Sequence, residues 1–180
     1  NKIKAYEGSS GNGVLFIADD PDEGGNVPFD SDYIATLVSA GYTTKKIYLS
    51  QFLTLTAAQA SLLNTLKGAE CGNVVLANYI GHADLDCIGR NSLNDAGLLC
   101  SGYLGTTMNW NAIPVFTAMT CVAGNFSMPG IDSLSESLIL SNNAAAVAFW
   151  ASTGLSLNDI SKVLDEGFFR AKSLAGANGA

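Results

Sequence analysis

The chain has 180 residues, with 9 basic and 16 acidic side chains, so its formal net charge is −7. A hydrophobic content of 48% excludes a disordered chain, and the length favours one domain with a sizeable core. The acidic balance argues against nucleic-acid binding and against docking on anionic lipid, because both need a basic face. We therefore expect a globular protein without a nucleic-acid partner.

The apolar runs and the two ends of the chain indicate where the protein is located. No apolar run reaches the ~18 residues that a membrane span needs, so we expect no membrane span. The chain opens without the basic start of a signal peptide and stops without a closing element. We read residues 1–180 as a single domain that is a piece of a longer precursor. Few charges and many Ser, Thr, Asn and Gly residues favour a secreted or cell-surface protein.

The chain begins its regular structure with an apolar run and an amphipathic segment. Residues 14–18 read Val-Leu-Phe-Ile-Ala, which predicts a buried strand. Residues 19–29 contain Asp, Gly and Pro, which predicts a loop. Residues 31–40 have apolar side chains at helical spacing, and Gly41 follows them as a C-cap signal.

The alternation continues with a second strand and a second helix. Residues 46–49 predict a short strand. Residues 56–67 predict a helix that Thr56 caps and Gly68 ends. Residues 73–80 are nearly all apolar, as expected for a central parallel strand that is covered on both faces.

The second half repeats the pattern after a long irregular stretch at 81–105. Residues 113–120 predict a strand, and residues 132–140 predict a helix with Asp132 or Ser133 as its cap.

The chain closes with one more strand and helix, at residues 144–151 and 158–174. Strands that alternate with helices predict an α/β sandwich with a mainly parallel sheet.

The four cysteines leave two interpretations open. They lack C-x-x-C spacing and the chain has one histidine, so a zinc site is not expected. Cys87 and Cys100 are near enough in sequence to close a loop with a disulfide, and two buried free thiols are the alternative. Cys71 follows a helix-like segment and is interpreted as a packing residue.

Reactive side chains follow three of the predicted strands. The first strand runs into the acidic residues 19–23, the third into Gly81 and His82, and the fourth into Cys121. Because sites in open parallel sheets form beyond the carboxyl ends of strands, we expect these groups at one edge. A thiolate with an imidazole neighbour is the minimal set for covalent acyl transfer, although a lone His or Cys is more often structural.

Two longer blocks carry a family resemblance. They are Val75-Leu-Ala-Asn-Tyr-Ile-Gly-His82 and Phe116-Thr-Ala-Met-Thr-Cys-Val-Ala-Gly-Asn-Phe126, with supporting matches at Phe16–Ala18, Asp30–Tyr33, Ser133–Leu138 and Ala145–Thr153. In this order the chain resembles the gingipain family of caspase-like cysteine peptidases.

The resemblance implies a caspase-like three-layer α/β sandwich and a Cys-His dyad. His82 falls on the family's catalytic histidine and Cys121 on its nucleophile. The family's oxyanion hole corresponds to the backbone N–H groups of Cys121 and Ala83. The chain departs from the family at Ala83, where family members often have Gly.

The resemblance also implies an acidic residue near the histidine. Asp20 is the best match, with Asp19 and Asp22 as alternatives because the loop aligns ambiguously. A solvated loop or a structural calcium site is the competing interpretation of these acids. No organic cofactor is expected.

Substrate binding is implied for three further residues. Asp32 falls where arginine-specific gingipains carry the acid of the specificity pocket, which would select a basic side chain. The alternative is that Asp32 caps the helix that starts there. Ile80 and Thr153 match family positions that border the substrate, whereas the family's aromatic residue has no match in residues 154–159.

The sequence therefore predicts a cysteine endopeptidase that forms an acyl-enzyme and prefers a basic residue before the scissile bond. Its partners are a protein or peptide substrate and other parts of its own precursor. A non-catalytic scaffold or binding domain and a transpeptidase on the same dyad are the alternatives.

Overall fold

The computed structural model describes residues 2–90 and 96–177. The strands are β1 (Gly13–Ala18), β2 (Thr43–Tyr48), β3 (Val74–Ile80), β4 (Cys87–Arg90), β5 (Gly97–Cys100), β6 (Val115–Met119) and β7 (Ala148–Ala151). The helices are α1 (Lys2–Glu7), α2 (Val27–Ala35), α3 (Leu55–Leu66), α4 (Leu134–Leu140) and α5 (Asn158–Ala177), with short 3-10 turns η1 (Leu49–Gln51) and η2 (Ser101–Tyr103).

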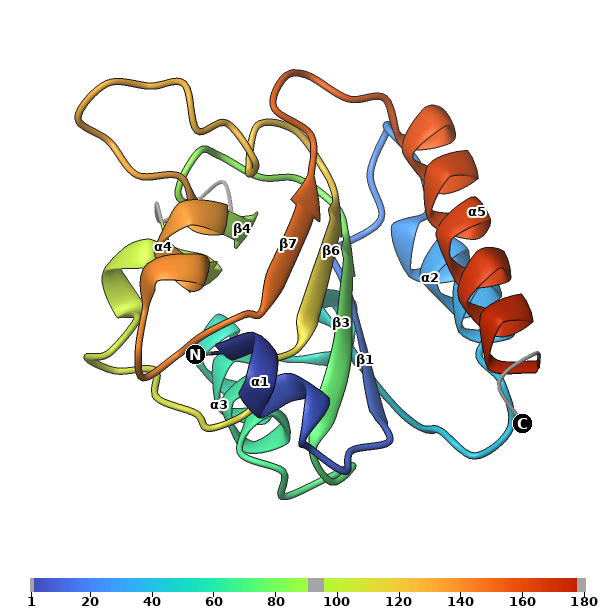
Figure 1. Cartoon of the computed structure of the whole chain (residues 1–180). Coiled ribbons are helices and arrows are strands. Elements are labelled where there is room, and N and C mark those ends of the chain that lie inside the picture. Colours follow the sequence, from blue (N-terminus) through green and yellow to red (C-terminus); the bar gives the residue numbers. More distant parts are fainter. Residues whose placement is uncertain (1, 91–95, 178–180) are drawn as a thin grey trace.

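Five strands form one parallel sheet in the order β2-β1-β3-β6-β7. Helices α2 and α5 cover one face, and α3 and α4 lie on the other (Figure 1). The prediction of a three-layer α/β sandwich with a mainly parallel sheet is confirmed. The order reverses between β1 and β3, and such a switch point is where open α/β sheets bind ligands at the carboxyl ends of their strands.

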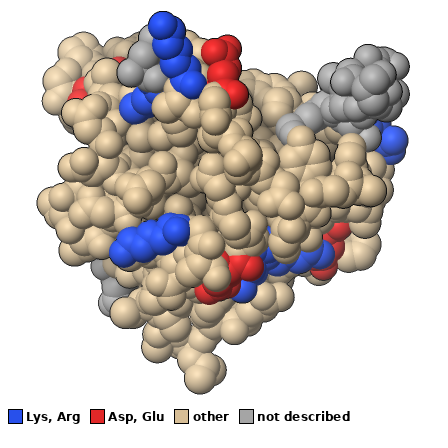
Figure 2. Space-filling view, turned by 60° about the horizontal axis from the view of Figure 1, so that its bottom comes forward, with Lys and Arg blue, Asp and Glu red and all other residues tan. Residues whose placement is uncertain are grey.

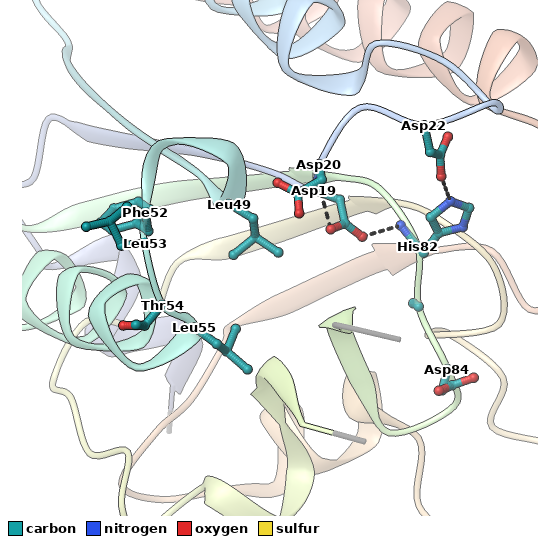
Figure 3. A pocket seen from close by; sticks show the side chains of 11 residues that line it. Asp19, Asp20, Asp22, Leu49, Phe52, Leu53, Thr54, Leu55, His82 and Asp84 are labelled. Atoms are coloured by element: carbon teal, nitrogen blue, oxygen red, sulfur yellow. Dashed lines mark hydrogen bonds and ion pairs between the residues drawn. The ribbon is translucent and has the colours of Figure 1, made fainter. Parts of the chain in front are cut away.

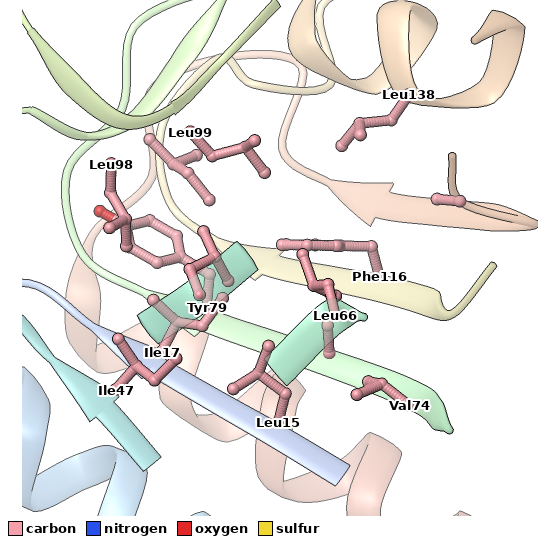
Figure 4. Close-up of a cluster of buried hydrophobic side chains, with 14 of the residues drawn as sticks. Leu15, Ile17, Ile47, Leu66, Val74, Tyr79, Leu98, Leu99, Phe116 and Leu138 are labelled. Carbon is pink, nitrogen blue, oxygen red and sulfur yellow. The ribbon is translucent and has the colours of Figure 1, made fainter. Parts of the chain in front are cut away.

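Alternation along the strands builds a core on each face of the sheet. Leu15 and Ile17 of β1 pack with Tyr79 and Phe116 in the cluster of Figure 4, and all four are buried. The intervening residues of β1 face the opposite way, where Phe16 packs on Phe169 of α5 at a ring-centroid distance of 5.5 Å. Burial on both faces explains why β1 is apolar throughout and β3 is nearly so, with the buried Asn78 as its amide residue.

Two helices begin earlier than predicted. Helix α2 covers residues 27–35 rather than 31–40, because the side chain of Asn26 accepts the N–H of Phe29 and a proline stands in the first turn. The C-cap of α2 is Thr36, so Gly41 does not end the helix. Helix α3 starts at Leu55 with Thr54 as its cap, which makes the prediction of Thr56 wrong.

The hydroxyl of Ser133 accepts the N–H of Glu136 in a capping box at α4, which settles the choice between Asp132 and Ser133. The predicted start of the last strand is wrong, because β7 begins at Ala148 and not at residue 144. Residues 144–146 are buried in the core ahead of the strand, which explains their apolar character.

Two features were not predicted. Helix α1 precedes β1, and an antiparallel hairpin of β4 and β5 lies within the stretch 81–105 that was expected to be irregular. Cys87 and Cys100 face each other across this hairpin and form a disulfide. Ile88, Leu98 and Leu99 of the hairpin are buried in the core, and a bridge that closes a loop of this size contributes about 3 kcal/mol.

The surface is sparsely charged. On the face shown in Figure 2, basic groups lie apart from one another, some beside acidic ones, and uncharged residues cover most of the area. Within residues 2–90 and 96–177, no helix is long and apolar enough to cross a bilayer.

Candidate active site

The ends of three neighbouring strands lie in register. Ala18 of β1 pairs with Ile80 of β3, and Ile80 pairs with Met119 of β6. The residues that follow these strands therefore meet at one edge of the sheet, as the sequence predicts. They include Asp19 after β1 and His82 and Cys121 shortly after β3 and β6.

A tight turn leads from β3 into His82. Gly81 has a φ of +156°, and a Cβ at this position would lie 2.5 Å from both the Cβ of Asp19 and the hydroxyl oxygen of Tyr79. Only glycine fits this space. The Tyr79 hydroxyl donates to the carbonyl of His82 at 2.5 Å and accepts the N–H of Gly89 at 2.9 Å. Tyr79 thus fixes the backbone on both sides of the turn.

Asp19 supports the same turn from β1. Its side chain is buried, and its Oδ2 accepts the backbone N–H of His82 at 3.3 Å and lies 3.4 Å from the Tyr79 hydroxyl. Burial raises the pKa of Asp19, while the N–H groups of Asp20 and His82 oppose that shift. Asp19 contacts the backbone of His82 and not its ring, so it positions the residue.

The imidazole of His82 pairs with Asp22. Nε2 of His82 lies 2.5 Å from Oδ2 of Asp22, and this hydrogen bond lowers the pKa of the Asp22 carboxyl. Asp22 was one of three acids considered for this place. The preferred residue, Asp20, is exposed and has no bond to the ring among the described contacts.

Cys121 lies in a strained turn after β6. The next residue, Val122, has a φ of +44°, and the N–H of Ala123 reaches back to the carbonyl of Cys121 at 2.5 Å, as in a γ-turn. A β-branched residue at positive φ is a genuine outlier, and such strain concentrates at functional sites. The thiol itself contacts the backbone of Ser156, with Sγ 3.4 Å from its N and 3.5 Å from its O.

His82 and Cys121 border the same hollow, which we call the thiol pocket. It has a volume of about 220 Å³ and is lined by Asp20, Asp22, Gly24, Val27, Gly81, His82, Met119, Thr120, Cys121, Ser156, Leu157, Asn158 and Ser161. The hydroxyl of Thr120 is buried and has no hydrogen-bond partner among the described residues. A buried polar group without a partner indicates a place where a ligand can bond.

A larger hollow of about 660 Å³ shares His82 with the thiol pocket but is not lined by Cys121 (Figure 3), and we call it the leucine pocket. It is lined by Asp19, Asp20, Asp22, Leu49, Phe52, Leu53, Thr54, Leu55, His82, Ala83 and Asp84. Ala83 forms an antiparallel bridge with Ile88, but the bonds of that bridge come from the N–H groups of Asp84 and Gly89. The bridge therefore does not use the Ala83 N–H.

The remaining predicted residues lie outside these hollows. Asp32 is inside α2 and not at its cap, and its carboxylate accepts bonds from Lys46 at 2.6 Å and Tyr48 at 2.8 Å. Ile80 is a buried core residue, and Thr153 is exposed after β7. None of the three is among the lining residues of either pocket.

The described residues contain no group of three side chains that is suited to hold a metal ion. Asp22, one of the acids considered for a structural calcium site, is engaged by His82.

Comparison with known proteins decides the family. The profile of peptidase family C25 matches residues 1–177. The chain belongs to peptidase family C25. No curated protein gives a significant match.

Two solved structures of the C25 family share the fold. The complex of Porphyromonas gingivalis RgpB pro- and mature domains matches 91% of this chain with a TM-score of 0.70 and 20% identity. The Arg-specific cysteine proteinase gingipain R (RgpB) matches 87% with a TM-score of 0.61 and 20% identity. The chain spans 37% of the length of each matched chain. The likeness shows the gingipain fold.

Sequence reasoning missed Tyr79 and Ser156. Tyr79 reads as an ordinary strand residue, although a tyrosine in an otherwise apolar central strand needs a partner for its hydroxyl. Ser156 acts through its backbone, for which the sequence carries no signal.

Proposed function

We propose that this C25 chain is a cysteine endopeptidase with Cys121 as nucleophile and His82 as general acid and base. The observation that carries the proposal is that both side chains, brought from the ends of β6 and β3, line the one thiol pocket. Strain at Val122 and the fixed turn at Gly81 are typical of residues held in place for chemistry.

The reaction begins with transfer of the thiol proton of Cys121 to His82. The sulfur then bonds to the carbonyl carbon of the substrate, and the π electrons move onto the oxygen. The backbone N–H groups of Cys121 and Ala83 stabilise this oxyanion. When the tetrahedral intermediate collapses, the C–N bond breaks and the leaving amine takes its proton from His82.

Hydrolysis of the thioester completes the cycle. His82 accepts a proton from a water molecule, whose oxygen bonds to the acyl carbon. The C–S bond then breaks, and the proton returns to the sulfur of Cys121. No cofactor enters these steps. Asp22 holds Nε2 of His82, which fixes the orientation of the ring and leaves Nδ1 for proton exchange.

The acyl side of the substrate occupies the thiol pocket. The sequence assigns the preference for a basic side chain to Asp32. In this proposal Asp20 selects that side chain instead, because Asp20 lines the thiol pocket, whereas the carboxylate of Asp32 is bonded to Lys46 and Tyr48. A relative with the same fold is Arg-specific. The Thr120 hydroxyl directly precedes Cys121 in the chain and has no hydrogen-bond partner among the described residues, so it can bond to the substrate.

Two observations support a location and a partner for the enzyme. A disulfide between Cys87 and Cys100 is typical of an oxidising compartment, which favours a secreted or surface protein. A matched structure is a complex of pro- and mature domains, which supports a partner from the same precursor.

A non-catalytic C25 chain is the second candidate. The observation in its favour is that the Cys121 thiol contacts the backbone of Ser156, with no bond to His82 among the described contacts. Hydrolysis of a peptide library by the purified chain separates the two. Activity lost in Cys121→Ala and kept in Cys71→Ala supports the peptidase, while activity that survives Cys121→Ala refutes it. A transpeptidase would instead give amide products when an amine is supplied.

A further inference from the structure

The leucine pocket is connected to the catalytic groups through His82. His82, Asp20 and Asp22 line both hollows, whereas Cys121 lines the thiol pocket alone. His82 gives its proton to the leaving amine in the proposed reaction. The hollow that contains His82 but not the nucleophile therefore lies on the leaving-group side of the scissile bond.

One wall of the leucine pocket is apolar and unusually open to solvent. Leu49, Phe52 and Leu55 are only partly buried, and Leu53 has an exposed fraction of 103%. In Figure 3, Leu49 and Leu55 project from the η1–α3 segment toward the space beside the acidic residues. A large apolar side chain placed here would remove this surface from water.

The local structure of this wall is well defined. The N–H of Phe52 bonds to the carbonyl of Leu49 at 3.0 Å and closes η1. The side chain of Thr54 accepts the N–H of Ala57 and caps α3. Because hydrogen bonds fix both sides of Leu53, ligand binding would not have to order the segment first.

The leucine pocket also has an acidic side. The exposed Asp20 lines it, and the lining set contains no Lys or Arg. A substrate carboxylate brought beside Asp20 is repelled by the like charge. The lining therefore admits apolar or basic groups and opposes acidic ones.

We propose that the leucine pocket binds the residue after the scissile bond and selects a large apolar side chain over small or acidic ones. This inference rests on the proposed peptidase function. It assigns Leu53, Leu49 and Phe52 as specificity-determining residues for the leaving group.

The test compares four peptide substrates on the purified full chain. Internally quenched peptides share one acyl side and carry Leu, Phe, Ala or Asp after the scissile bond. We expect kcat/KM for Leu or Phe to exceed that for Ala by about tenfold, with Asp lowest. Leu53→Ser should bring the Leu-to-Ala ratio of kcat/KM from about tenfold to near one.

Leu140→Ser is the matched control, because Leu140 is also exposed, at the end of α4. Equal rates for all four peptides, or a Leu-to-Ala ratio that stays near tenfold in Leu53→Ser, would overturn the inference while leaving the peptidase intact. Absence of hydrolysis of every peptide would overturn the proposed function and this inference together.

Discussion

Oδ2 of Asp22 lies 2.5 Å from Nε2 of His82, although the two residues are 60 positions apart in the chain. The position of Asp22 is fixed by its own loop, because the backbone of Asp22 pairs with Gly25 in a small bridge. On the other side, Asp19 and Tyr79 hold the backbone of His82. The orientation of the imidazole thus depends on the loop after β1 as well as on β3.

Asp22→Asn should lower kcat/KM by about tenfold. A hydrogen bond that involves a charged group contributes about 1.5–3 kcal/mol, and the exposure of this pair places it near the lower limit. The measurement is peptide hydrolysis as a function of pH. Asp20→Asn is the matched control on the neighbouring acid, and on substrates without a basic residue it should stay near the wild-type rate. A larger effect of Asp20→Asn on those substrates would mean that Asp20, and not Asp22, is the acid that supports His82.

Gly81→Ala should impair both activity and stability. The added Cβ would clash with Asp19 and with the Tyr79 hydroxyl, so the turn that carries His82 must shift. A displacement of about 1 Å at a catalytic group costs about a hundredfold in rate. Gly102→Ala is the control, because a Cβ there meets nothing within 4 Å. Wild-type kinetics in Gly81→Ala would show that the turn does not position His82.

Asp165 should make stability depend on pH. It is buried on α5, accepts both of its short bonds from Nδ2 of Asn78, and burial raises its pKa to about 7. Between about pH 4 and pH 7 the folded state binds the extra proton, so the free energy of unfolding falls as pH rises through this window. Below about pH 4, where the carboxyl is protonated in both states, this contribution is constant.

Asp165→Asn should remove that dependence. Urea unfolding at about pH 5 and about pH 8 should show a decline in the wild type that exceeds the decline in the variant by about 2–3 kcal/mol. Asp159→Asn changes an exposed acid of the same helix and should behave as the wild type does. Parallel pH profiles for wild type and Asp165→Asn would contradict the shifted pKa.

Lys162→Met should destabilise the fold more than Lys46→Met. Lys162 pairs with Asp30, whose side chain is 11% exposed, whereas Lys46 pairs with Asp32, whose side chain is 51% exposed. Loss of Lys162 leaves a nearly buried carboxylate whose remaining partner among the described side chains is Asn158, which we expect to cost about 2 kcal/mol. The exposed pair should contribute about 0–1 kcal/mol. Equal unfolding midpoints for the two variants would refute this ranking.

The sequence predicts the parallel sheet and the place of His82 and Cys121, because apolar strands are read directly and their carboxyl ends share an edge. It does not identify the acid at His82, since Asp19, Asp20 and Asp22 differ only in the path of the loop. The hairpin of β4 and β5 was missed because it is short and held by a disulfide whose pairing was left open.

The central claim is that Cys121 is a nucleophile activated by His82, and alkylation by iodoacetamide across about pH 4 to 9 tests it most directly. The labelled cysteine is identified by mass, with Cys71 as the internal control. The account predicts that Cys121 is labelled much faster than Cys71 near neutral pH, and that this reactivity is lost in His82→Ala. Slow labelling, or labelling that is the same in His82→Ala, would contradict the dyad and favour a non-catalytic C25 chain.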